Sequence, residues 1–130
     1  IPANTLDSSC FIWTTMAFSK NSAGSVTTRL YINNANTLTG ATLLGFIAGA
    51  SNRNFDFNRK FLVNGTSLDL LTGSTISTQV SNEFVENLYA ASTVLTINPS
   101  ADIFLIYTTQ NDATGTVATN KMATVQKMKL

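Results

Sequence analysis

The side chains that could perform acid–base chemistry are few and scattered along the chain. The chain has seven carboxylates, and they are Asp7, Asp56, Asp69, Glu83, Glu86, Asp102 and Asp112. Glycoside hydrolysis needs two carboxylates opposed across a cleft. Folding could oppose Asp56 and Asp69, but no spacing selects that pair. Glu83 and Glu86 could share one loop, although two solvated carboxylates are the simpler interpretation. The sequence therefore predicts no catalytic carboxylate pair.

The chain contains no histidine and one cysteine. Without histidine, neither a Ser–His–Asp set nor a His-activated thiol can form, and zinc and iron lack their usual ligands. The acids do not have the spacing of a calcium loop. Cys10 stands in the apolar run Cys10-Phe11-Ile12-Trp13 and is predicted to be a small buried residue. We therefore expect no enzyme activity, no metal site and no cofactor.

Aromatic side chains are the remaining candidates for recognition, because they can stack on the apolar faces of sugars. Trp13 and Tyr107 lie in apolar runs and are predicted to belong to the core. Tyr31 and Tyr89 lie in more polar surroundings. These two tyrosines are the candidate surface-binding residues.

The charge of the chain excludes two classes of partner. The formal net charge is +1 and charged residues make up 12% of the chain, about half the usual share. Lys121, Lys127 and Lys129 are the only basic cluster, and lysines of this kind are typical of a protected edge strand. No apolar run reaches the length of about 18 residues that a membrane helix needs. We expect neither nucleic-acid binding nor membrane insertion.

Two strands dominate the elements that must position these residues. Residues 26–32 alternate, with Val26, Thr28, Leu30 and Ile32 on one parity. Residues 54–63 alternate in the same way, with Phe55, Phe57, Phe61 and Val63 on the inner parity. This period of two is typical of half-buried strands, so Leu30, Ile32 and the three phenylalanines should share one core. Arg59 also falls on the inner parity, and a bulge there could re-aim its side chain.

Further strands are predicted between turn signals. They span residues 9–19, 42–48, 67–71, 92–97, 102–109 and 117–130. Asn64-Gly65 is a strong hairpin signal, and turns are also expected at Asn33-Asn34-Ala35-Asn36 and at Asn98-Pro99. Residues 72–82 read as a polar loop, and residues 83–91 are ambiguous between helix and strand. About eight short strands in 130 residues predict one all-β domain, an antiparallel sandwich or jelly roll.

Two of these strands are apolar on both parities, namely residues 9–19 and 102–109. One small sandwich does not readily hide so much apolar surface, so part of it should be buried between subunits. Phe104, Ile106 and Tyr107 are the candidate subunit-interface residues. The alternative is a monomer in which loops such as residues 72–82 cover these faces.

Several segments resemble the small β-domains at the ends of bacteriophage structural proteins. They are Ile1–Leu6, Thr28–Asn33, Asn36–Leu44, Phe57-x-Arg59-x-Phe61, Ile97-Asn98-Pro99-x-x-Asp102-x-x-Leu105-Ile106, and Gln110–Asp112. Domains of this kind include jelly rolls of the tumour-necrosis-factor type, which form knobs of trimeric fibres, spikes or capsid decorations.

This resemblance implies a homotrimer on the virion surface, in contact with other virion proteins and without catalytic residues. It implies attachment to a host-surface glycan or protein, or alternatively capsid decoration without a receptor. The chain begins abruptly at Ile1, which we interpret as the distal part of a longer virion protein.

Overall fold

The computed structural model describes residues 1–6, 10–21, 24, 26–47, 54–71, 94–111 and 114–129. Within these ranges every regular element is a β-strand, and there is no helix. The strands are β1 (Cys10–Lys20), β2 (Val26–Asn33), β3 (Thr42–Ile47), β4 (Asn54–Asn64), β5 (Ser67–Leu71), β6 (Val94–Thr96), β7 (Phe104–Asn111) and β8 (Ala118–Lys129). The predicted all-β class is confirmed. The ambiguous segment 83–91 and the predicted loop 72–82 lie outside the described residues.

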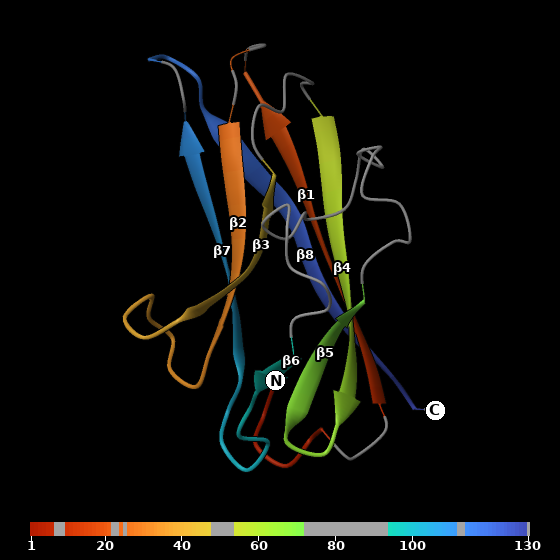
Figure 1. Cartoon of the computed structure of the whole chain (residues 1–130). Coiled ribbons are helices and arrows are strands. Elements are labelled where there is room, and N and C mark those ends of the chain that lie inside the picture. The colour runs from red at the N-terminus through yellow and green to blue at the C-terminus, as the bar shows by residue number, and fades with distance from the viewer. Residues whose placement is uncertain are drawn as a thin grey trace.

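The strands form two antiparallel sheets. One sheet has five strands in the order β6-β5-β4-β1-β8, and the other has three in the order β3-β2-β7. In Figure 1 the three-stranded sheet stands on the left and β1 and β4 stand on the right, while β8 runs behind them from the upper left to the lower right. Buried side chains from both sheets pack together between them. This arrangement is consistent with a β-sandwich.

The alternation predicted for residues 26–32 is confirmed in β2. Val26, Thr28, Leu30 and Ile32 are buried between the sheets, whereas Arg29 and Tyr31 are half-buried on the outer side. β2 is the central strand of its sheet, so its pairing with β3 and β7 decides which side chains share the outer face. A shift in the β2–β3 register between Leu30 and Tyr31 marks a bulge.

The core joins residues that lie far apart in the sequence. It contains Leu6, Cys10, Ile12, Met16, Phe18, Leu30, Ile32, Leu44, Phe61, Val63, Ile97 and Ile103. The predictions for Leu30, Ile32 and Phe61 are confirmed, and so is the burial of Cys10. The side chains of Phe55 and Phe57 lie outside the described part of the structure.

The bulge predicted at Arg59 is wrong. The β1–β4 register runs without a shift from Cys10↔Val63 to Ser19↔Asn54, and Arg59 pairs with Thr14. Arg59 therefore keeps its inner parity and is only 3% exposed. The buried residues Thr14 and Thr28 place two further polar groups between the sheets. The Arg59 side chain, which was expected to turn outward, thus stays between the sheets, where other polar side chains are also buried.

Both strands on one side of the sandwich are edge strands. β7 was predicted to be buried on both faces, but it ends the three-stranded sheet and none of its residues is fully buried. An apolar run in an edge strand looks the same in sequence as one in a central strand. β8 ends the five-stranded sheet, and Lys121, Lys127 and Lys129 are exposed on it. The predicted role of these lysines on an edge strand is confirmed.

The hairpin predicted at Asn64-Gly65 is also confirmed. Asn64 pairs with Ser67 across the two loop residues Gly65 and Thr66. Gly65 has φ of +61°, whereas the backbone of Thr66 is not in the positive-φ region. A two-residue hairpin loop with glycine at its first position matches the type II′ turn, which follows the twist of the flanking strands.

Candidate functional site

The outer side of the three-stranded sheet carries five large apolar side chains, which we call the aromatic face. They are Tyr31 on β2, Leu43 and Phe46 on β3, and Phe104 and Ile106 on β7. Tyr31 pairs with Leu43 on one side and with Ile106 on the other, so the three side chains form a row across the sheet. Residues directly opposite each other on paired strands lie close enough for their side chains to touch.

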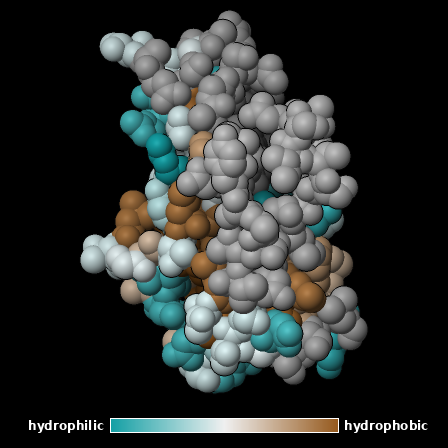
Figure 2. Space-filling view, in the orientation of Figure 1, coloured by the Kyte–Doolittle hydropathy of each residue, from teal (hydrophilic) through white to brown (hydrophobic). Residues whose placement is uncertain are grey.

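The aromatic face is only partly covered. Leu43 is 44% exposed, and the other four side chains are half-buried. An antiparallel sheet normally turns polar side chains to the solvent on this side. Hydrophobic side chains reach the surface beside β3 at the left of Figure 2. A group of apolar side chains on the outside of a sheet is typical of a contact surface.

The structure brings three of the five predicted site residues to one place. Tyr31, Phe104 and Ile106 were predicted for two separate roles, yet all three belong to the aromatic face. Tyr107 has the opposite parity and pairs with the buried Leu30. It therefore packs against the core and is not part of that face. Tyr89 lies outside the described residues.

A short chain of hydroxyl groups connects the two sheets at Tyr107. The Thr14 hydroxyl donates a hydrogen bond of 3.1 Å to the Thr124 carbonyl oxygen, and it also contacts the Tyr107 hydroxyl. The Thr14 hydroxyl has one proton and donates it to the Thr124 carbonyl oxygen. The Tyr107 hydroxyl is therefore the donor in its contact with the Thr14 hydroxyl oxygen. Burial raises the pKa of Tyr107 above its ordinary value of 10.0.

This raised pKa predicts a loss of stability at alkaline pH. The folded state disfavours tyrosinate, so the contribution of Tyr107 is complete below its unfolded pKa and disappears as the pH rises through the folded pKa. Tyr107→Phe should be less stable than the parent chain near neutral pH, by about 1 kcal/mol for the lost hydrogen bond. Above about pH 10 the difference should shrink. Urea unfolding at a series of pH values measures it, and two parallel stability curves would contradict the prediction.

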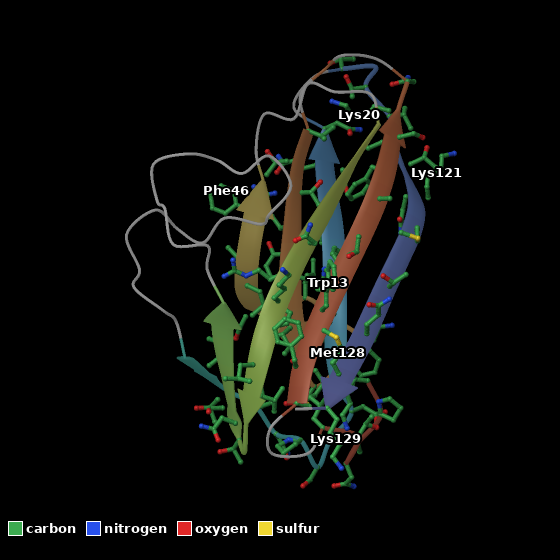
Figure 3. The ribbon with its side chains drawn as sticks, turned by 90° about the vertical axis from the view of Figure 1, so that its right-hand side faces the viewer. Trp13, Lys20, Phe46, Lys121, Met128 and Lys129 are labelled. Atoms are coloured by element: carbon green, nitrogen blue, oxygen red, sulfur yellow. The ribbon has the colours of Figure 1, made fainter. Side chains whose placement is uncertain are left out.

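Trp13 was predicted to be a core residue, but it lies half-buried on the outer side of the five-stranded sheet. Lys60 faces it from β4, with its Nζ atom 5.1 Å from the centroid of the Trp13 ring. This distance fits a cation–π contact. Figure 3 shows Trp13 and Met128 on this side of the sheet, with Lys121 and Lys129 toward opposite ends of β8. These two lysines are therefore too far apart to form one basic patch.

A second surface feature, which we call the amide pocket, lies at the end of β2. Its volume is about 220 Å³, and Ile32, Asn33, Asn34, Gly40, Thr42, Thr96, Ile97 and Ile103 line it. The three isoleucines are buried, whereas the asparagines and threonines have neutral polar side chains and are half-buried or exposed. None of the described residues that line the pocket has a charged side chain. It therefore offers hydrogen bonds beside apolar carbon and no ionic contact.

The asparagine side chains hold one wall of this pocket in place. The Asn33 Nδ2 group donates to the carbonyl oxygens of Thr37 and Thr39, at 2.8 and 3.0 Å, which closes the turn between β2 and β3. The Asn34 Nδ2 group donates to the Asp102 carbonyl oxygen at 2.9 Å, which connects this turn to the segment before β7. The two walls of the pocket are thus tied to each other directly.

The other wall is held by the N-terminal segment. The nitrogen of Ile1 donates to the Ile103 oxygen, and the Ile103 nitrogen donates to the Ile1 oxygen, both at 2.8 Å. The Asn4 backbone nitrogen donates to the Pro99 carbonyl oxygen at 2.7 Å. The Asp102 carboxylate accepts a bond of 2.8 Å from the Ala3 nitrogen, so its charge is directed to the N-terminal segment. The pocket is therefore preformed.

Sequence reasoning identified none of the polar residues of the amide pocket as a binding residue. Asn33, Asn34 and Asn98 were interpreted as turn formers, which they are. The available signal was the run Asn33-Asn34-Ala35-Asn36, because it supplies more amides than a turn requires. Its partner segment, residues 97–103, lies more than 60 positions away in the sequence, so their contact could not be foreseen.

The described part of the chain has neither a cluster of metal ligands nor a helix that could cross a membrane. No group of three or more histidine, cysteine, aspartate or glutamate side chains there could hold a metal ion. Among the same residues there is also no helix with the length and apolar character to cross a membrane. Comparison with protein-family models, with curated proteins and with solved structures finds no match to this chain. The site therefore has to be interpreted from its own geometry.

Proposed function

We propose that this chain is an interaction domain on the surface of a virus particle, the distal knob of a phage fibre, spike or tail protein. In this proposal it attaches the particle to a host-surface glycan or protein. The observation that carries the proposal is the aromatic face, which presents five large apolar side chains on the outer side of a sheet. Such a surface serves contact between proteins better than it serves chemistry.

The strand pairing supports the jelly-roll part of the proposal. β1 pairs with β8 and β2 pairs with β7, so the two ends of the chain wrap around each other in successive layers. A jelly roll brings sequence-distant strands together in this way. The β4–β5 hairpin is a further local pair. We propose a jelly roll of about eight strands, in which β7 and β8 are edge strands of the two sheets.

We also propose that the chain assembles as a homotrimer, and the same features support this. Phe104 and Ile106 lie on an edge strand, where a neighbouring subunit can approach without displacing another strand. β8 adds three apolar side chains that are 44–48% exposed, Met122, Val125 and Met128. Closed symmetry buries such surface on identical subunits and ends one fibre in one knob. Other virion proteins would contact the remaining surface.

Sedimentation equilibrium of the full chain at micromolar concentration tests the assembly. We expect the mass of three 13.9 kDa chains. A stable mass of one chain at every concentration would remove the trimeric knob. A glycan array probed with the same material tests attachment. Binding would support the attachment role, and a trimer that binds no glycan and no host-surface protein would favour a decoration role without a receptor.

A further inference from the structure

We propose that the amide pocket binds a single neutral sugar ring, and that this ring is the part of the host-surface glycan that the domain recognises. The inference rests on the proposed attachment role and names the ligand class for it. Its first support is size. The pocket volume of about 220 Å³ lies below the range of about 300–1,000 Å³ that holds drug-sized ligands. One monosaccharide ring fits such a space, with the rest of the glycan outside.

The second support is the chemistry of the lining. A pyranose ring carries neutral hydroxyl groups around its rim and apolar C–H groups on its faces. The pocket offers the hydroxyl groups of Thr42 and Thr96 and the Oδ1 atom of Asn34, beside buried isoleucine carbon. The described residues of the lining carry no charge, so they supply no ionic partner for a phosphate, a sulfate or a carboxylate.

The third support is that the polar atoms are already held in place. The Asn34 Nδ2 group donates to the Asp102 carbonyl oxygen, and this hydrogen bond fixes the orientation of the side-chain amide. The Oδ1 atom of the same amide remains as an acceptor in a fixed position. Asn33 holds the turn with two hydrogen bonds of its own. A site whose groups are fixed before binding loses less conformational entropy when the ligand arrives.

The position of the pocket agrees with a ligand longer than one ring. Asn33 lines the pocket and pairs with Phe104 of β7, and Tyr31 lies two residues earlier on the same outer parity of β2. The pocket therefore lies next to the aromatic face. Because the proposed trimer buries the aromatic face between subunits, a glycan with its terminal ring in the pocket continues along the rim of that contact, beside Asn33.

Nuclear magnetic resonance of the isotope-labelled full chain tests the inference. The probes are the methyl glycosides of glucose, galactose, mannose and N-acetylglucosamine, with N-acetylneuraminic acid as the charged comparison. We expect at least one neutral glycoside to bind with a millimolar dissociation constant, as is usual for a ligand of this size. The backbone signals of Gly40, Thr42 and Ile97 and the side-chain signals of Asn34 should shift.

Two isosteric variants test the assignment of the polar groups. Thr42→Val and Thr96→Val each remove one exposed hydroxyl without changing the shape of the side chain. Each should weaken binding of the same glycoside by about three- to tenfold. Thr39→Val is the matched control, because Thr39 is exposed in the same turn but does not line the pocket, and it should leave binding unchanged.

Each outcome bears on one proposal or the other. If no neutral glycoside shifts the pocket signals, if only the charged sugar does, or if all three variants bind equally, the inference is wrong. If a trimer binds glycans but the shifted signals all belong to residues outside the pocket, the attachment role remains and the pocket is not its site. A monomer that binds no glycan or protein of the host surface, yet binds free glycoside in the pocket, would keep the pocket and remove the attachment role.

Discussion

Leu30→Ala is expected to lower the free energy of unfolding by about 3 kcal/mol or more. Leu30 is 0% exposed and lies on the central strand of the three-stranded sheet. Its cross-strand neighbours are Gly45 and Tyr107, and neither can move easily to fill the space. Glycine has no side chain, and the Tyr107 hydroxyl is held by Thr14. The cavity therefore remains, and its cost adds to the loss of buried apolar surface.

Leu38→Ala is the matched control for this prediction. It removes the same atoms from a side chain that is 51% exposed in the turn between β2 and β3. A substitution of this kind on the surface should change the stability by no more than about 0.5 kcal/mol. Urea unfolding followed by circular dichroism measures both variants. Equal losses for the two leucines would show that Leu30 does not occupy the centre of the core.

The strands could be predicted because their signal is local. In β2 and β4 one parity is apolar and the other polar, and the buried and exposed positions of Leu30, Tyr31 and Phe61 follow from a period of two alone. The turn at Gly65 follows from two adjacent residues. None of these predictions depends on which strand lies next to which.

Strand position within a sheet could not be predicted. The run Phe104–Tyr107 is apolar on both parities, which suits a strand covered on both faces. It also suits an edge strand with one parity in the core and the other on a contact surface, and the structure has this second arrangement. Arg59 shows the same limit, because the sequence does not tell that its inner position lies opposite the buried polar residue Thr14.

The candidate site is formed by strands that are far apart in the sequence. Some of its residues could therefore be named from the sequence, but their arrangement could not. Tyr31 and Ile106 were identified separately, and only the β2–β7 pairing makes them neighbours. The pocket residue Thr96 gave no signal at all, since its role depends on a turn formed by residues 33–42. A single residue such as Tyr31 can be named from the sequence, but a surface built from three strands cannot.

Ile106→Asp is expected to reduce self-association by at least about 100-fold. Ile106 lies on β7 opposite Tyr31, so subunit contact through the aromatic face would bury the new carboxylate. The basic side chain on the same face, Arg29, already donates a hydrogen bond of 3.0 Å to Gln110. An uncompensated buried charge costs about 3–5 kcal/mol, which corresponds to a factor of 100 or more in an association constant. The same carboxylate is hydrated in the isolated chain, because Ile106 is not fully buried there. The single chain should therefore remain folded.

Thr109→Asp separates loss of contact from loss of the strand. Thr109 is another β-branched residue of β7, but it is exposed and its parity is opposite to that of Ile106. The Thr109→Asp substitution should therefore change the sedimentation profile little. Aspartate is unfavourable in β-strands, and this effect should be similar in both variants. If Ile106→Asp remains as associated as the parent chain, the aromatic face is not the subunit contact. The exposed edge of β8, with Met122, Val125 and Met128, then becomes the surface to replace next.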